Sequence, residues 1–345
     1  MPLWESAAVL NHETYDAPAV VASMPSSSLM REFATLEVDL ALACLGGVMA
    51  DCASWDHVVT LEAWCADDAD NASATPPRSP SSRARARRGR RRLQEVGGGP
   101  NELARYITPF RRQVGRWVTD VTPLMPLLYH DRCNFTAEVT SGHGWTVTAS
   151  LRFSGAVARG AATPAAVVPL VWPNANDEFD SVSAYNANRT LAFSAPAGAT
   201  KVVLEALVTG HGDCEMAPTA HHWYFNGAVA QAEDYQAAFL GAGTMWGCSD
   251  QVLGGSEPNE HGTWNYGRDG WCDGEAVKPR TFDVTDAVDL DPSATNNITY
   301  FALSWGADDD ARFDASIHHE YLAPATPTDG CGGYILMSSN LVFYS

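Results

Sequence analysis

Apolar and polar residues alternate along several short stretches of this chain, whereas the three-to-four-residue spacing of amphipathic helices is scarce. The clearest stretch is 145–153 (WTVTASLRF), in which every second residue is apolar. Because successive side chains of a strand point to opposite faces, this pattern predicts a half-buried β-strand. Clusters of Gly, Pro, Asn and Asp separate such stretches, and short strands divided by turn residues are typical of β-sandwiches. We therefore expect an all-β protein.

One stretch also predicts a particular turn. His222–Phe225 and Ala228–Ala230 have the character of strands, and Asn226-Gly227 lies between them. Asn-Gly accepts the positive φ angles of a type I′ turn, which joins two antiparallel strands through a two-residue loop. The sequence therefore predicts a tight hairpin here.

An internal repeat indicates two similar domains, which a chain of 345 residues is long enough to form. DVT at 120–122 is followed by NFT at 134–136, and DVT at 283–285 is followed at the same spacing by NIT at 297–299. We interpret each DVT as the end of one strand and each Asn as the start of a later strand.

Two further stretches set the limits of these domains. Residues 156–166 are rich in Ala and Gly, so we predict a first domain over 1–158 and a second over 165–345. Ala66–Pro100 contains eight arginines and few apolar residues, which predicts a disordered insert in the first domain. A mistranslated intron would look the same, and Arg85–Arg88 also fits an R-x-R-R processing site.

Charge and cysteine content limit the partners and the compartment. The net charge of −19 argues against nucleic acid and against an anionic membrane as partners. The longest apolar stretch, Leu40–Ala50, is too short to span a bilayer. Eight cysteines, none in a CxxC string, argue against a zinc ribbon, and with four N-x-S/T sequons they indicate an oxidising compartment. The first residues do not resemble a signal peptide, so we expect a secreted protein whose leader is missing from this N-terminus. A cytosolic protein with buried thiols is the alternative.

The run Glu257–Cys272 (EPNEHGTWNYGRDGWC) is the strongest sign of a binding site. Its aromatic residues, Trp264 and Trp271 among them, offer the apolar faces on which sugar rings stack, and Arg268 supplies a polar contact. Cys272 could bond to Cys248 and hold this loop. The alternative is an aromatic loop that packs on its own domain.

A second informative string is CASWD at residues 52–56. A Cys44–Cys52 disulfide, if formed, would close a tight loop just before Asp56. Asp56 would then stand at the start of a strand beside Trp55, where desolvation could raise its basicity. An Asp that caps a turn is the alternative.

Six strings resemble one known family when they are taken in order. They are CASWD, ARYITPF, WVTDVT, GHGDCEM with HH and NG after it, AGTMWGC and GTWNYGRDGWC. Together they are similar to the peptide-N-glycosidase F family, over nearly the whole chain outside the Arg-rich insert. The resemblance implies two eight-stranded antiparallel jelly rolls packed side by side. It also implies hydrolysis of the amide between Asn and the first N-acetylglucosamine of N-linked glycans.

The resemblance places three carboxylates in the site. Asp56 matches the principal catalytic carboxylate, which we expect to activate the water. Glu215, from the second domain, would position that water or the sugar across a cleft between the domains. Glu138 matches a third carboxylate, although the loop after it is shorter here than in the family. Arg268 would orient Glu215 or bind the first sugars.

Further residues are carried over as substrate contacts. Trp55 and Trp271 would stack on the sugar, and Trp264 and His211 are additional candidates for substrate binding. Taken alone, His211 is expected to be a hydrogen-bonded loop residue. The family's pairing also implies a Cys248–Cys272 disulfide.

Two departures from the family affect the proposed chemistry. Residues 213–217 lack the second Cys that the family has around its Glu, and His57 stands where the family usually has Arg. These changes favour a sugar-binding protein without activity as the first alternative. A copper monooxygenase-like protein is the second, because His221-His222 and His318-His319 are paired, and no Cys–His string supports a cysteine hydrolase. Our expectation remains a monomeric hydrolase of N-glycosylated proteins that needs no metal and no cofactor.

Overall fold

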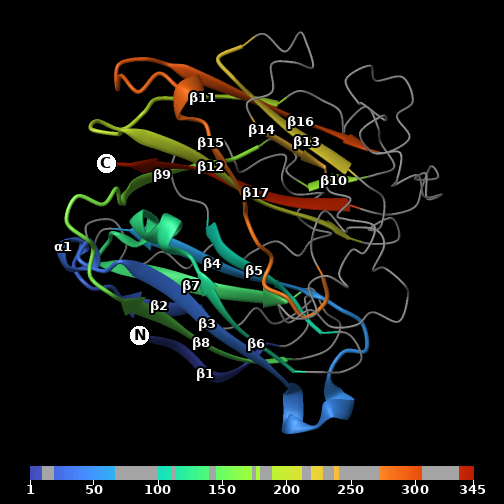
Figure 1. Cartoon of the computed structure of the whole chain (residues 1–345). Helices are drawn as coiled ribbons and strands as arrows, with labels where there is room; N and C mark the ends of the chain where they lie inside the picture. Colours follow the sequence, from blue (N-terminus) through green and yellow to red (C-terminus); the bar gives the residue numbers. More distant parts are fainter. Residues whose placement is uncertain are drawn as a thin grey trace. The chain divides into compact units, whose positions relative to one another are not determined.

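The structure is a computed structural model of the chain (Figure 1). It describes residues 1–9, 19–66, 100–109, 114–139, 145–172, 176–178, 189–211, 219–227, 237–240, 272–304 and 334–345. The chain divides into two compact units. The first comprises Met1–Val167 with Asp273–Val277, and the second comprises Val168–Cys272 with Lys278–Ser345. The domain limits at 158 and 165 stay proposals. The return of residues 273–277 to the first unit was not predicted.

The first unit consists of two four-stranded antiparallel sheets (Figure 1). Sheet A has the order β1 (Pro2–Val9), β8 (Trp145–Ser154), β3 (Thr35–Cys44) and β6 (Gly115–Asp120). Sheet B has the order β2 (Val20–Ser23), β7 (Arg132–Val139), β4 (Val58–Ala66) and β5 (Asn101–Ile107). Short helical segments join them, namely α1 (Ser27–Met30), η1 (Leu45–Gly47), η2 (Met49–Asp51) and η3 (Thr122–Leu128).

Alternating burial explains why these strands form a sandwich. Every second residue from Leu36 to Leu42 on β3 is buried, and β8 buries every second residue from Trp145 to Leu151. The buried side chains of sheet B include Phe135 on β7 and Leu61 on β4. The apolar faces of the two sheets thus form one core. The strand predicted at 145–153 is confirmed by β8.

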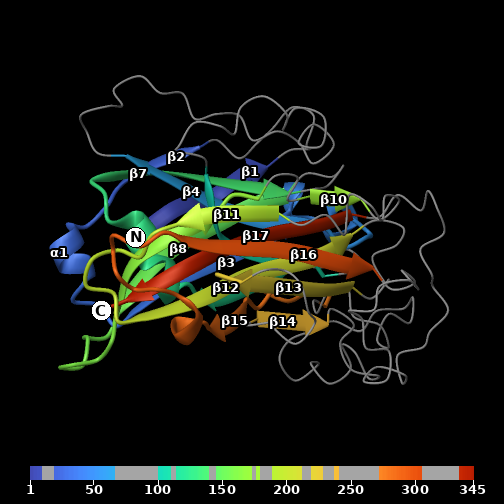
Figure 2. The same cartoon turned by 90° about the horizontal axis from the view of Figure 1, so that it is seen from above.

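The second unit repeats this arrangement. Sheet C has the order β10 (Asn176–Glu178), β17 (Tyr334–Tyr344), β12 (Lys201–His211) and β15 (Arg280–Asp283), and β9 (Pro164–Leu170) also pairs with β17. Sheet D has the order β11 (Arg189–Phe193), β16 (Asn296–Ser304), β13 (Thr219–Phe225) and β14 (Ala237–Leu240). The strands of sheet D lie in this order across Figure 2. η7 (Thr285–Ala287) follows β15.

The strand orders of the two units are the same. Counted within each unit, with β9 left out, both units have the orders 1-8-3-6 and 2-7-4-5. An eight-stranded double sheet of this kind is a jelly roll. The predicted all-β fold of two eight-stranded antiparallel jelly rolls is therefore confirmed.

The DVT repeat marks a connection that both units share. In the first unit the backbone N–H and the hydroxyl of Thr122 donate to Oδ1 of Asp120, at 2.9 and 2.5 Å. The hydroxyl oxygen of Thr122 then accepts the backbone N–H of Leu36 on β3, at 2.9 Å. This turn fastens the end of β6 to its neighbour in the sheet.

The second unit contains the same contacts. The N–H and the hydroxyl of Thr285 donate to Oδ1 of Asp283, at 3.1 and 2.6 Å, and the oxygen of Thr285 accepts the N–H of Val202 on β12, at 3.1 Å. The repeat therefore reflects one Asx-type turn that occurs after β6 and again after β15.

The predicted tight hairpin is wrong. Asn226 does have a positive φ of 53°, as a turn residue should. A two-residue loop would pair Trp223 with Ala230, but Trp223 pairs with Ala237 on β14. The side chain of Asn226 instead donates to Oδ1 of Asn296, at 2.6 Å, which fixes the end of β13 to β16. Asn226 thus adopts the backbone conformation of a turn, but the connection from β13 to β14 is longer than the predicted two residues.

A disulfide that the sequence left unassigned joins Cys65 on β4 to Cys133 on β7. The two residues are direct partners in the sheet, with Cα atoms 4.0 Å apart. The Arg-rich insert begins where β4 ends at Ala66, and all of it except its two ends lies outside the described residues. In the described part of the chain, no helix has the length and apolarity that crossing a membrane would require.

Candidate active site

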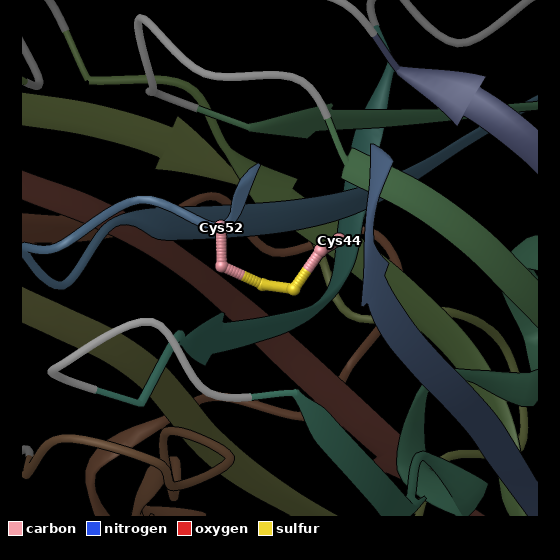
Figure 3. Close-up of a disulfide and its surroundings, with 2 residues drawn as sticks. All are labelled: Cys44 and Cys52. Carbon is pink, nitrogen blue, oxygen red and sulfur yellow. A yellow bond between two sulfur atoms is a disulfide. The ribbon is translucent and has the colours of Figure 1, made fainter. Parts of the chain in front are cut away.

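The chain before Asp56 is held by a disulfide. Cys44, the last residue of β3, is bonded to Cys52, with Cα atoms 4.6 Å apart (Figure 3). Both cysteines are buried. In the chain-entropy model such a short loop contributes about 2–3 kcal/mol to stability. The bond therefore fixes the end of β3 to a point four residues before Asp56.

The chain after Asp56 is held by Thr108, the residue that follows β5. The N–H of His57 donates to Oγ1 of Thr108, at 2.8 Å, and the N–H of Thr108 donates to the carbonyl of His57, at 2.9 Å. Asp56 is half-buried between these two restraints, while Trp55 beside it is 56% exposed. A fixed carboxylate next to an exposed aromatic face is an arrangement that suits a sugar.

Glu138 lies on β7, on the face of sheet B that points away from the core. Val59 and Leu61 on β4 face the core, so Thr60 faces the other way, and β4 begins at Val58, two residues after Asp56. Glu138 on β7 pairs directly with Thr60. Glu138 and Thr60 therefore share the outer face of sheet B, and Asp56 lies just before the strand that carries Thr60.

Sequence reasoning missed a buried charged pair on this face. Arg105 on β5 also pairs with Thr60 and is 2% exposed. Its Nε and Nη2 atoms donate to the two carboxylate oxygens of Glu102, each at 2.7 Å. Glu62, next along the face, is buried as well. A buried charge is tolerated only when it is paired. The Arg within the apolar stretch LARYI was therefore the sequence signal from which this pair could have been predicted.

A segment of the C-terminal half extends sheet B. We call residues 272–277 the strap. The N–H of Ile107 donates to the carbonyl of Glu275, at 2.9 Å, and the N–H of Val277 donates to the carbonyl of Arg105, at 2.8 Å. In Figure 1 this orange segment runs beside β5. The strap thus lies one strand away from β4, the strand that begins two residues after Asp56.

The remaining predicted residues are distributed as follows. Outside the described residues lie Glu215, Arg268, Trp271, Trp264, Cys248 and the pair His318-His319. Cys272 is buried and disulfide-bonded, and its partner lies beyond the part of the chain that the structure describes.

The structure corrects one expectation about the histidines. His211 is the last residue of strand β12 and not a loop residue, and its Nε2 lies 2.6 Å from the hydroxyl of Thr209. His221 is buried, with its Nδ1 2.9 Å from the hydroxyl of Tyr300. Within the described ranges, no group of three His, Cys, Asp or Glu side chains is placed to hold a metal ion.

Comparison with protein families defines the class of the protein. The family model described as Peptide-N-glycosidase F, N terminal, matches residues 14–153 of this sequence. The family model described as Peptide-N-glycosidase F, C terminal, matches residues 179–342. These are the two halves of a hydrolase class that acts on N-glycosylated proteins. Since the matches cover most of the sequence, the chain belongs to the peptide-N-glycosidase F family. A search of curated proteins gave no match.

Solved structures of this family have the same fold. The structure of PNGase F, a glycosylasparaginase from Flavobacterium meningosepticum, is 15% identical, covers 100% of this chain and 95% of its own, and superposes with a TM-score of 0.62. Recombinant PNGase F is 14% identical over 100% of this chain and 95% of its own, with a TM-score of 0.61. PNGF-II is 15% identical over 99% of this chain and 65% of its own, with a TM-score of 0.62. At such identities the likeness shows the fold alone.

Proposed function

We propose that this chain releases N-linked glycans by hydrolysing the amide between Asn and N-acetylglucosamine, with water activated by Asp56. Family membership supports the reaction. The observation that carries the role of Asp56 is its restraint on both sides, by the Cys44–Cys52 disulfide and by the His57–Thr108 hydrogen bonds. The exposed ring of Trp55 next to Asp56, and Glu138 on β7, beside β4, add groups that could contact a sugar.

The chemistry requires one proton to move. Asp56 takes a proton from water, and the water oxygen attacks the carbonyl carbon of the substrate Asn. The C–N bond then breaks, and the departing nitrogen receives the proton that Asp56 holds. The products are Asp in the peptide and a glycosylamine. A positioned carboxylate base contributes about 10²–10⁴ to the rate of such a step.

The other residues of the proposed site bind or orient the substrate. Glu215 would position the water or the sugar, and Glu138 would hydrogen-bond the sugar from β7. Arg268 would orient Glu215 or bind the first sugars. Trp55 and Trp271 would stack on the glycan and exclude water.

The test is the substitution Asp56→Asn, which keeps the shape of the side chain and removes the base. We expect release from a denatured glycoprotein to fall at least about 10²-fold while the melting temperature is unchanged. The readout is mass spectrometry of the former glycan-bearing Asn, which hydrolysis converts to Asp. Asp51→Asn is the matched control, because Asp51 is exposed and lies inside the disulfide-closed loop that ends four residues before Asp56. Release at the parent rate by the Asp56 variant would contradict the assignment.

Glycan binding without hydrolysis is the second candidate. It is favoured by His57, which stands where the family usually has a cation beside its catalytic Asp. An unmodified glycoprotein after incubation with the parent protein, together with binding on a glycan array, would support this candidate over hydrolysis.

The disulfides favour an oxidising compartment. Two are formed among the described cysteines, and disulfides are rare in the cytosol. We propose that the protein is secreted or acts within the secretory route, where its glycoprotein substrates occur.

A further inference from the structure

Each unit carries an N-x-T sequon at the same place in its fold. Asn134 lies on β7 and Asn297 on β16, and each follows the DVT turn of its unit at the same spacing. β7 and β16 are also the second strands in the orders of sheets B and D. In a secreted protein the Asn of such a motif is an acceptor for an N-linked glycan. The two units therefore offer two equivalent acceptors.

The structure distinguishes these two acceptors by their exposure. On each strand the residues directly before and after the Asn are buried. Because successive side chains of a strand point to opposite faces, each Asn lies on the outer face of its sheet. On that face Asn297 is exposed, whereas Asn134 is half-buried.

The cross-strand partners explain this difference. Asn134 pairs with Trp64 on β4, and directly opposed side chains of a sheet stand on the same face, so a large indole lies beside it. Asn297 pairs with Ala192 on β11, which is small and itself exposed. A glycan is bulky and needs solvent around the amide nitrogen that carries it. Asn297 meets this requirement better than Asn134.

The main chain of Asn297 is fixed by the sheet. Its N–H donates to Oδ1 of Asn226, at 2.8 Å, and its carbonyl accepts the N–H of Asn226, at 2.9 Å. The hydroxyl of Thr299, the threonine of the sequon, lies 2.8 Å from the hydroxyl of Thr190 on β11. A transferase needs access to the Asn and to the Thr, so attachment must precede the pairing of β16. None of these contacts uses the amide nitrogen that would carry the glycan.

We propose that Asn297 carries an N-linked glycan in the secreted protein and that Asn134 is the poorer acceptor of the pair. The proposal requires passage through the secretory route, which is part of the proposed function, but it does not require hydrolysis. The other two sequons, at Asn71 and Asn188, lie outside the described residues.

The test is secretion of the full chain from insect cells, with an added leader, followed by mass spectrometry of the peptides that contain Asn297 and Asn134. We expect a glycan at Asn297 in most molecules and an occupancy at Asn134 that is at least about threefold lower. An unmodified Asn297 in the secreted protein would overturn the assignment. An occupancy at Asn134 equal to that at Asn297, or higher, would overturn the role of exposure.

Thr299 provides a matched pair of variants. Thr299→Ala removes the hydroxyl that the sequon needs and should abolish the glycan at Asn297, whereas Thr299→Ser keeps an N-x-S motif and should retain it. Asn297→Gln removes the acceptor and leaves the contact between Thr299 and Thr190 in place. Each loss should appear as the mobility shift of one glycan in gel electrophoresis. A glycan that persists at Asn297 in Thr299→Ala would contradict the assignment.

The variant Asp56→Asn separates self-hydrolysis from a site that is never used. An active parent could remove its own glycan and leave Asp at position 297, so the occupancy is also measured in Asp56→Asn. A glycan in this variant supports the site whatever the activity of the parent. Absence of the glycan from both proteins, with Asn still at position 297, would overturn the site whether or not the chain hydrolyses other glycoproteins.

Discussion

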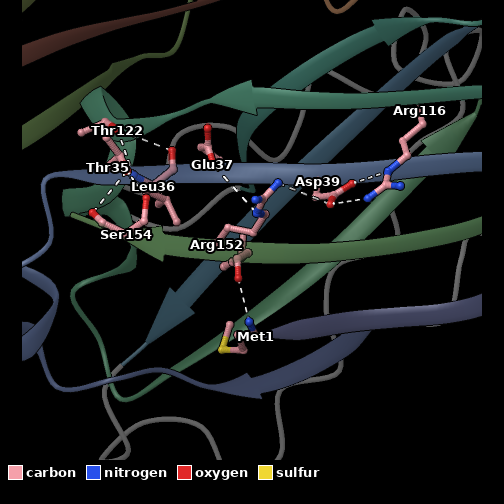
Figure 4. Close-up of polar contacts among 10 residues, drawn as sticks. Met1, Thr35, Leu36, Glu37, Asp39, Arg116, Thr122, Arg152 and Ser154 are labelled. Atoms are coloured by element: carbon pink, nitrogen blue, oxygen red, sulfur yellow. Dashed lines mark hydrogen bonds and ion pairs between the residues drawn. The ribbon is translucent and has the colours of Figure 1, made fainter.

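Asp39 connects three strands of sheet A through its side chain (Figure 4). The guanidinium of Arg116 on β6 donates to both carboxylate oxygens, at 3.0 and 2.9 Å, and Nη1 of Arg152 on β8 lies 3.7 Å away. The hydrogen bond from Arg116, followed by the charges of both arginines, lowers the pKa of Asp39 below its usual value of 3.8. The outer face of a sheet is thus held by charge pairs where the inner face is held by apolar packing.

This lowered pKa predicts a pH dependence of stability. A carboxylate with a lower pKa in the fold stabilises the protein above pH 3.8, and this contribution is lost as the pH falls through the folded pKa. Asp39→Asn should therefore lower the melting temperature at pH 7, by up to about 3 °C for a pair at the surface. The difference from the parent should shrink as the pH falls below 3.8 and vanish once the pH is below the folded pKa. Thermal unfolding followed by circular dichroism from pH 2 to pH 7 measures it.

Glu37→Gln is the control for this prediction. Glu37 lies on the same face of β3, but its ion pair is the longer one with the half-exposed Arg152, at 3.9 Å. We expect a smaller effect of this change at pH 7. A difference between Asp39→Asn and the parent that persists at pH 2 would contradict the explanation.

At the scale of single residues, sequence reasoning succeeded where chemistry is local. Asp56 follows a Cys and a Trp in one short string, and both the disulfide and the exposed ring are found beside it. Arg105 was not singled out, because its importance depends on burial and on Glu102. An arginine in a strand looks like a surface residue until the opposite side of the sheet is known.

At the scale of the element, strands were predictable and their partners were not. The alternation at 145–153 gave β8, because the pleat of a strand acts on successive residues. The Asn226-Gly227 signal did not give the pairing of β13, since Trp223 finds its partner fourteen residues away at Ala237. A turn signal specifies a local backbone conformation and leaves the length of the connection open.

The two described disulfides should differ in what they stabilise. Cys65–Cys133 closes a loop with a sequence separation of 68, and Cys44–Cys52 one of 8. In the chain-entropy model the first contributes about 4 kcal/mol and the second about 2.5 kcal/mol to the free energy of unfolding. Replacing Cys65 and Cys133 together by Ala should therefore lower stability more, as measured by denaturant unfolding.

Activity should show the opposite order. The Cys44–Cys52 bond fixes the chain before Asp56, so replacing both cysteines by Ala should reduce glycan release more than the Cys65 and Cys133 double variant does. If the Cys65 and Cys133 variant were the less active and the more stable of the two, both assignments would be wrong.

At the scale of the whole molecule, the Arg-rich insert should be dispensable for folding. β4 and β5 are antiparallel partners on either side of it, with Ala63 paired to Asn101. Replacing residues 69–98 by six Gly and Ser residues leaves this pairing reachable, and the shorter loop changes its closure by only about 1 kcal/mol. We expect the melting temperature to stay within about 4 °C of the parent. An insoluble product or a much lower melting temperature would show that the insert belongs to the fold.

The sequence by itself determined the all-β class, the two repeated units and the local surroundings of Asp56, namely the disulfide before it and the aromatic ring beside it. These follow from alternation, from turn residues and from short strings, all of which act between residues close together in the chain. The tertiary structure alone decided the Cys65–Cys133 bond, the burial of Arg105 and the return of residues 273–277 to the first unit. Each of these depends on which strands become neighbours when a sandwich closes, and that choice is made by the packing of both sheets together.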